Sequence, residues 1–124
     1  SFDDHHIYPK DYLKKFFDWE TERNAIDNVM NRTLIPKLTN IKIKNKSPLE
    51  YMNQILQKNK SFPKCLKSHM IPNEVMLPNF QGKDGYSSFL KLRSKIVYKA
   101  IKDSVDSKKD SVVKIWFDEN PELF

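Results

Sequence analysis

Two short stretches of the sequence hold residue types that bind cations and move protons. The first is DDHHIYP at residues 3–9, where two aspartates precede two adjacent histidines. The second is NRTLIPKLTN at residues 31–40, where two asparagines lie nine positions apart. Histidine is a common general base and metal ligand near neutral pH, and an asparagine carbonyl oxygen suits a hard cation such as Mg²⁺. A hairpin joining the two stretches would bring a base and cation ligands together.

Adjacent residues of a β-strand point to opposite faces. His5 and His6 are therefore predicted to flank a phosphate, one facing a cation and the other facing water, and not to bind the same ion. Asp3 lies two residues before His5, so in an extended segment it shares that face. Asp3 is a candidate further ligand, or a hydrogen-bonding partner of a ligand.

The hydrophobic pattern predicts short strands at 5–9 and 31–36, with one or two helical turns at 11–20 between them. The clearest helix is SPLEYMNQILQK at 47–58. It begins with Ser47 as N-cap, a proline at the first helical position and a glutamate that completes a capping box. The segment KLTNIKIKNK between the second strand and this helix fits either a strand or a short helix.

The C-terminal half is predicted to be helical. Apolar residues recur at three- and four-residue steps over 86–105, which predicts an amphipathic helix of about 20 residues. Gly82 and Gly85 indicate a turn between two parts of one domain. The sequence therefore predicts a single mainly helical α+β domain over 1–124, in which a short β-hairpin plus helix is followed by a helical C-terminal part. The boundaries of these two parts are residues 3–58 and 62–124.

The net charge of +6 is unevenly distributed: residues 31–70 hold nine Lys or Arg against one acidic residue. Such a patch fits a polyanion, most often nucleic acid, although a solvated lysine-rich surface explains it as well. The single cysteine, Cys65, allows no internal disulfide, which fits a reducing compartment, and we expect it to be a buried apolar residue. No stretch approaches the roughly 20 apolar residues of a membrane span. A cytoplasmic location without membrane contact is expected.

The ordered set DHHIYP, NRTLI, LTN and NKSPLEY resembles the HNH endonuclease motif in its ββα-metal fold. It is similar to the version at the C-terminus of modification-dependent (type IV, GmrSD-like) restriction enzymes and related phage-defence proteins. The asparagine spacing also resembles that of the HNH domain of CRISPR effector nucleases. The resemblance covers residues 3–51, and the weaker similarity of CLKSHMIP and YSSFLKLRSKIVYKAI to the helical tail of the restriction group extends it to residue 103.

This resemblance implies a role for each matching residue. His6 matches the general base that activates water, and His5 matches the first metal ligand. Asn31 matches the asparagine that orients the loop and the base, and Asn40 matches the last metal ligand. Ile41 departs from the Arg or Lys usual in the family. The predicted phosphate contacts are Lys42, Lys44, Lys46 and Arg32.

The implied function is metal-dependent hydrolysis of a DNA phosphodiester bond, with Mg²⁺ or Mn²⁺ as cofactor. One site cuts one strand, so a monomer is expected to nick DNA, in the restriction of foreign or modified DNA. Because the chain starts almost on the motif, we expect an N-terminal sensor or NTPase-like domain in the parent protein. A non-catalytic nucleic-acid-binding module of a defence protein, and an RNA-directed or toxin nuclease, remain the alternatives.

Overall fold

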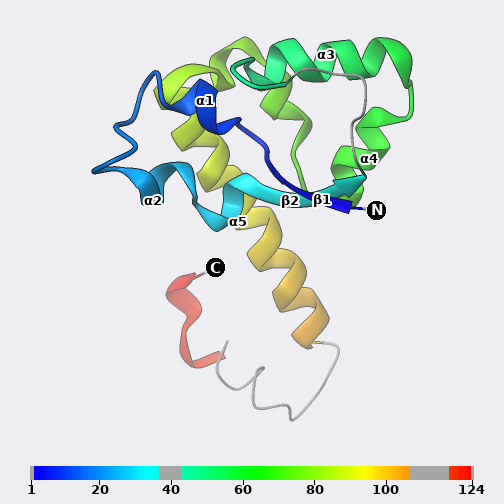
Figure 1. Ribbon diagram of the computed structural model, residues 1–124. Helices are drawn as coiled ribbons and strands as arrows, with labels where there is room; N and C mark the ends of the chain where they lie inside the picture. Colours follow the sequence, from blue (N-terminus) through cyan, green and yellow to red (C-terminus); the bar gives the residue numbers. More distant parts are fainter. Residues whose placement is uncertain (1, 37–42, 107–117, 124) are drawn as a thin grey trace.

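The computed structural model describes residues 2–36, 43–106 and 118–123, and it is mainly helical with one two-stranded antiparallel sheet (Figure 1). The predicted α+β class is therefore confirmed. In chain order, the elements are β1 (Phe2–His6), α1 (Lys10–Leu13), α2 (Arg23–Ile26), η1 (Val29–Asn31), β2 (Arg32–Pro36), α3 (Pro48–Lys58), α4 (Phe62–Ser68), η2 (Asn73–Met76), η3 (Pro78–Phe80), α5 (Gly82–Asp106) and η4 (Pro121–Leu123). Among the described residues, no helix combines the length and apolar character needed to cross a bilayer.

The strands β1 and β2 pair in a register that places His5 opposite Thr33 and His6 opposite Arg32. The second strand lies where the sequence predicts it, but β1 ends at His6, so the predicted strand 5–9 was wrong in its extent. The reason is that the backbone N–H and C=O of Tyr8 are both bonded by the side chain of Asn31, at 2.7 and 3.0 Å. Residues after His6 therefore leave the sheet and enter the core.

Helix α3 confirms the prediction made from its capping residues. The Ser47 hydroxyl accepts from the Glu50 backbone N–H at 3.2 Å, and the Glu50 carboxylate accepts from the Ser47 N–H at 3.3 Å. The predicted helix at 11–20 is shorter: α1 ends at Leu13 and the chain continues in turns that pack Phe16 and Phe17 against the core. Of the segment 37–46, residues 37–42 lie outside the described part, and 43–46 form neither strand nor helix.

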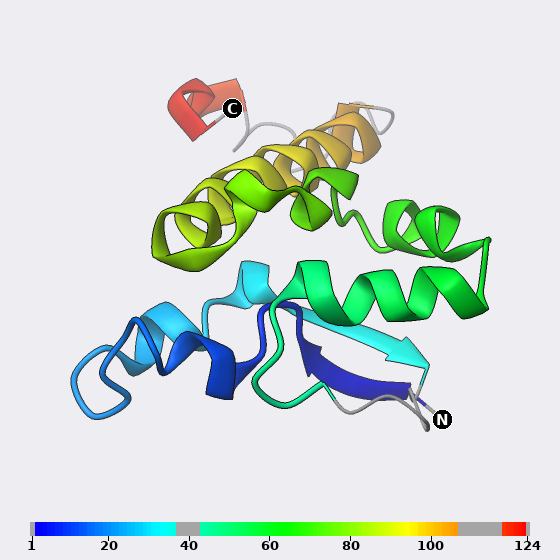
Figure 2. The same cartoon turned by 90° about the horizontal axis from the view of Figure 1, so that it is seen from above.

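The core is built mainly from the residues that follow β1 together with buried side chains of α1, α3, α4 and α5 (Figure 2). Tyr8 is fully buried, and its ring centroid lies 4.9 Å from that of Phe89 and 5.0 Å from that of Tyr86, both on α5. Its hydroxyl donates to the carbonyl of Phe80 at 2.7 Å, so this large aromatic residue is buried without an unpaired polar group. The residue two positions after His6 thus anchors the hairpin to α5.

Arg93 of α5 is a buried cation that binds only carbonyl groups among the described residues. Its guanidinium donates to the carbonyls of Met30, Arg32, His69 and Met70 at 2.7–3.4 Å. Burial lowers the pKa of this group below its usual value. Because two of the carbonyls belong to η1 and the start of β2 and the other two to the residues directly after α4, Arg93 joins the hairpin to the rest of the helical part.

The two glycines do not form a turn between two parts of the domain, and that prediction was wrong. Gly82, with φ of +74°, begins α5, and Gly85 lies in the first turn of the same helix. Gly85 is needed because η3 passes very close: a Cβ at this position would lie 2.1 Å from the carbonyl carbon of Phe80. The glycine at position 85 is therefore explained by the close approach of the η3 backbone to the first turn of α5.

A Gly85→Ala substitution is expected to lower the free energy of unfolding by about 3 kcal/mol, because backbone must shift to admit the methyl group. This loss exceeds the gain of about 1 kcal/mol that alanine brings to a helix. Urea denaturation followed by circular dichroism measures the difference. Ser88→Ala, at an exposed position of the same helix, is the control. Equal stability of the two variants would show that η3 does not constrain α5.

Candidate functional site

The end of β1 places its two histidines in different surroundings. The His6 Nε2 lies 2.8 Å from the Oδ1 of Asp27, and the His6 side chain is 21% exposed. The His5 Nε2 is buried, and among the described residues it is the only buried side-chain nitrogen or oxygen without a hydrogen-bond partner. Both side chains line one cavity, although adjacent residues of a regular strand are expected to point to opposite faces. One imidazole is therefore held by a carboxylate, and the other has a nitrogen available to a ligand.

Asp27 is a partner of His6 that no pattern in the sequence indicated. It follows α2 directly, and its backbone N–H donates to the Arg23 carbonyl at 2.9 Å. The preceding residue, Ile26, is fully buried. The hydrogen bond from His6 lowers the pKa of the Asp27 carboxyl. It is one of seven acidic residues between positions 1 and 30, and its spacing of 21 residues from His6 matches no short motif.

Arg32 is held in an ion pair, which bears on its predicted contact with phosphate. Its Nε donates to the Asp4 carboxylate at 3.2 Å, and its Nη2 contacts the other oxygen of the same group. Its Nη1 lies 3.8 Å from the Asp27 Oδ1. The Arg32 hydrogen bond is the largest cause of the lowered pKa of Asp4. Arg32 is thus already bonded to one carboxylate and near another, so binding a phosphate would mean exchanging these partners.

Asn31 is fully buried and fixes the loop that follows His6. Its Oδ1 accepts from the Tyr8 N–H at 2.7 Å, and its Nδ2 donates to the carbonyls of Tyr8 and Ile26 at 3.0 and 3.2 Å. Its own carbonyl accepts from the Ile7 N–H at 2.7 Å. The side chain touches the backbone beyond His6 and that of the residue before Asp27. These contacts are consistent with its predicted role of orienting the loop after His6.

Several predicted site residues lie outside the described part of the chain. These are Asn40, Lys42 and the side chain of Asp3, whose backbone belongs to β1. Lys44 is exposed in the turn before α3. Lys46 is partly buried, and its Nζ donates to the Gln54 Oε1 at 3.2 Å. The described residues therefore bring together His5, His6 and Asn31, with Arg32 close by.

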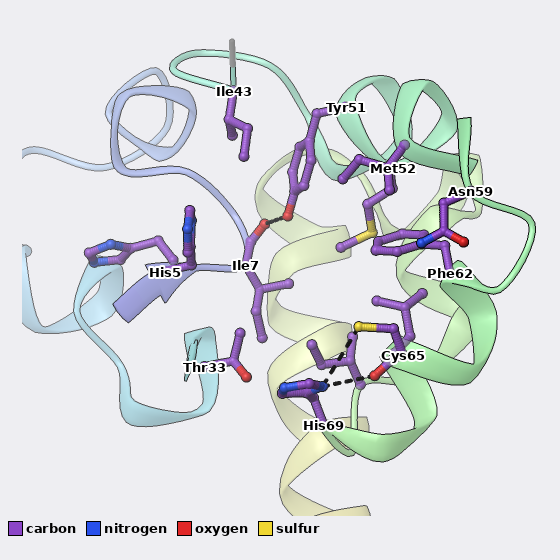
Figure 3. Close-up of a pocket in the computed structure, with 14 residues that line it drawn as sticks. His5, Ile7, Thr33, Ile43, Tyr51, Met52, Asn59, Phe62, Cys65 and His69 are labelled. Atoms are coloured by element: carbon purple, nitrogen blue, oxygen red, sulfur yellow. Dashed lines mark hydrogen bonds between the residues drawn. The ribbon is translucent and has the colours of Figure 1, made fainter. Parts of the chain in front are cut away.

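A cavity of about 170 Å³ lies beside the histidines (Figure 3). His5 and Thr33 line it from the hairpin, whereas Met52 and Cys65 line it from α3 and α4. Most of the lining is apolar, so the cavity keeps the surroundings of His5 partly shielded from water. Within the described residues, no three His, Cys, Asp or Glu side chains are grouped so as to hold a metal ion.

His69 also lines this cavity, although its sequence context predicts a loop or core residue without a site. It is partly buried as the C-cap of α4, and its Nδ1 lies 2.9 Å from the Cys65 carbonyl oxygen. Cys65 is a free thiol. It is only partly buried, whereas the sequence predicts a buried residue. The spacing of Cys65 and His69, four residues apart, was a signal that both lie on one side of a helix.

Comparisons with known proteins identify no family. No protein-family model matches the chain, and no solved structure matches it. It is similar to "Uncharacterized protein MJ0686" of Methanocaldococcus jannaschii, with 30% identity over 119 residues. The aligned part covers 80% of this chain and 20% of that protein, so the chain spans about a fifth of the relative's length. A function for this chain must therefore be argued from its own residues.

Proposed function

We propose that this chain is a metal-dependent HNH endonuclease domain of the ββα-metal type, which nicks DNA. One observation carries the proposal: the adjacent His5 and His6 lie at the end of β1, where His6 is bonded to a carboxylate and the buried Nε2 of His5 has no partner among the described residues. A base that activates water and a ligand for a cation that neutralises the phosphate are the groups that metal-dependent phosphodiester hydrolysis uses. The order of β1, β2 and α3 also agrees with a hairpin followed by a helix.

His6 acts as the general base. A carboxylate only accepts hydrogen bonds, so the His6 Nε2 next to Asp27 carries a proton and the other nitrogen, Nδ1, has the free lone pair. Nδ1 takes a proton from water, the resulting hydroxide attacks phosphorus, and the bond from phosphorus to the leaving sugar oxygen breaks. Asn31 contributes by fixing the backbone two residues after His6.

The unpartnered Nε2 of His5 supports the binding of a divalent cation beside it. An unpartnered imidazole nitrogen is a good ligand for a first-row metal such as Mn²⁺, and amide or carboxylate oxygens also suit Mg²⁺. We assign His5 as a ligand, with Asn40 and Asp3 proposed to complete the set. When bound, the cation supplies charge neutralisation at the phosphate and stabilises the leaving oxygen. The proposed biological setting is restriction of foreign or modified DNA.

The alternative is a non-catalytic nucleic-acid-binding module, which is favoured by the basic excess of residues 31–70. Phosphate contacts from exposed lysines such as Lys44 serve either function, because they provide affinity and not chemistry. The two functions differ in what happens to DNA that is bound: the nuclease breaks it, and the binding module leaves it intact.

Supercoiled plasmid incubated with the chain and Mn²⁺ or Mg²⁺ is expected to become nicked circles. EDTA should abolish this product, because the reaction needs the cation. A His5→Ala variant should require a higher Mn²⁺ concentration for the same rate, and it should fold normally since the Nε2 of His5 has no hydrogen bond to lose. Gel electrophoresis separates the outcomes. Plasmid that is retarded in the gel but intact with either metal would support the binding module and refute the nuclease.

A further inference from the structure

We propose that Asp27 is a positioning residue for His6: it selects the tautomer of the imidazole with the proton on Nε2 and orients Nδ1 toward the reacting water. The use of this arrangement in catalysis rests on the proposed nuclease function. The hydrogen bond itself, between the His6 Nε2 and the Asp27 Oδ1 at 2.8 Å, does not depend on that function.

The Asp27 carboxylate decides which nitrogen of the His6 ring carries the proton. A free neutral imidazole places its single proton on either nitrogen, so only part of the population presents a given nitrogen as a base. The carboxylate of Asp27 accepts only, and it can bond to Nε2 only when that nitrogen carries the proton. The contact therefore makes Nδ1 the nitrogen with the available lone pair in nearly every molecule.

The backbone around Asp27 is held by hydrogen bonds. The N–H of Asp27 is bonded to Arg23, and the carbonyl of the neighbouring Ile26 accepts from Asn31 at 3.2 Å. The next residue, Asn28, caps η1 by accepting from the Met30 N–H at 2.9 Å. The backbone on both sides of the aspartate is thus fixed. A rigid acceptor restricts the rotation of the ring, as an active-site base requires.

Asn31 links the two segments of the chain that make this contact. Its side chain bonds to Tyr8, two residues after His6, and to Ile26, directly before Asp27. The histidine and the aspartate are 21 residues apart in sequence, yet the backbone just after the one and just before the other is bonded by the same buried amide. The arrangement keeps the two side chains in register, because movement of either segment would break bonds to Asn31.

Arg32 is placed to keep the aspartate ionised and in position. Its Nη1 lies 3.8 Å from the Oδ1 of Asp27, and its remaining nitrogens are bonded to Asp4. At this distance Arg32 attracts the Asp27 carboxylate without a hydrogen bond, whereas it is hydrogen-bonded to Asp4. Asp27 therefore lies between the ring of His6 and a guanidinium.

The test compares Asp27→Ala and Asp27→Asn with Asp103→Asn as a matched control. Asp103 is also an ion-paired aspartate, bonded to Lys99 at 3.2 Å on the exposed surface of α5. The readout is the pair of ¹⁵N chemical shifts of the His6 ring at a pH where the ring is neutral, which reports the tautomer without any need for activity. Wild type and Asp103→Asn should show the Nε2-protonated form, and Asp27→Ala should show a mixture of both tautomers.

Activity provides the second readout. The kcat for plasmid nicking by Asp27→Ala should fall about tenfold or more with the KM for DNA unchanged, because the substitution disturbs the base and not the binding surface. The amide of Asp27→Asn accepts through its oxygen or donates through its nitrogen, so this variant should show both tautomers and a kcat below that of wild type. If Asp27→Ala fails to fold, as judged by circular dichroism, the isosteric Asp27→Asn carries the test, with a partial loss of the Nε2-protonated form expected.

The outcomes separate this inference from the proposed function. An unchanged tautomer in a folded Asp27 variant would overturn the inference, whether or not the protein cuts DNA. A changed tautomer with undiminished kcat would also overturn it, since the aspartate would then play no part in the reaction. If wild type leaves plasmid intact with every metal, the nuclease proposal fails, and the tautomer measurement still decides whether Asp27 fixes the ring of His6.

Discussion

A His6→Ala variant is expected to nick plasmid DNA at least about 100-fold more slowly than the wild type, because a positioned general base contributes roughly this factor or more. The loss should appear in kcat, with little change in the KM for DNA, since no phosphate contact is removed. Single-turnover nicking assays with Mn²⁺ measure it. The variant should remain folded: the side chain of His6 is partly exposed and its described hydrogen bond is the one to Asp27.

The matched control for His6 is His69→Ala. His69 lines the same cavity, but its Nδ1 is next to the Cys65 carbonyl at the end of α4, so it has no place in the proposed reaction. This variant should nick DNA at nearly the wild-type rate. Comparable activity of His6→Ala and wild type would remove the general base from the proposal, and a large loss in both variants would indicate that the cavity as a whole, and not His6, supports activity.

The elements that could be predicted from the sequence are those whose signals are local. The capping box of Ser47 and Glu50 defines the start of α3 within four residues, and the apolar period of α5 continues over many turns. The extent of β1 was mispredicted because Tyr8 has the residue type of a strand, yet its backbone groups bond to an asparagine 23 positions later. Local patterns contain no information about such a distant partner.

The residues discussed for the candidate site also divide into those with a local signal in the sequence and those that depend on distant partners. His5, His6 and Asn31 were identified from residue type, order and spacing, and the hairpin brings them close together. Asp27 was missed because an aspartate after a short helix resembles any solvated acidic residue. Arg93 was missed because a lysine- or arginine-rich helix normally exposes its cations, whereas this guanidinium is buried among four carbonyls. Both become visible only when segments far apart in sequence are in contact.

The second large effect is expected at Asn31, where leucine in place of asparagine should lower the free energy of unfolding by about 3–5 kcal/mol. The size of the side chain is nearly conserved, so the loss comes from hydrogen bonds. The Tyr8 N–H and the carbonyls of Tyr8 and Ile26 would each lose the partner that Asn31 now provides in the protein interior. Urea denaturation measures the loss. Asn24→Ala, at an exposed position of α2, is the control and should change stability by less than about 0.5 kcal/mol.

The Asn31→Asp variant tests which of these bonds matters, through its dependence on pH. The introduced carboxyl keeps an acceptor for the Tyr8 N–H but, when ionised, faces the carbonyls of Tyr8 and Ile26 without a proton to donate. Burial beside two carbonyls raises the folded-state pKa of this carboxyl above its unfolded value of about 3.9. The stability of the variant relative to wild type is therefore greatest below the unfolded value and falls as the pH rises through the folded-state pKa. A stability difference from wild type that stays constant with pH would mean that the donated bonds of Asn31 contribute little to fixing the loop after His6.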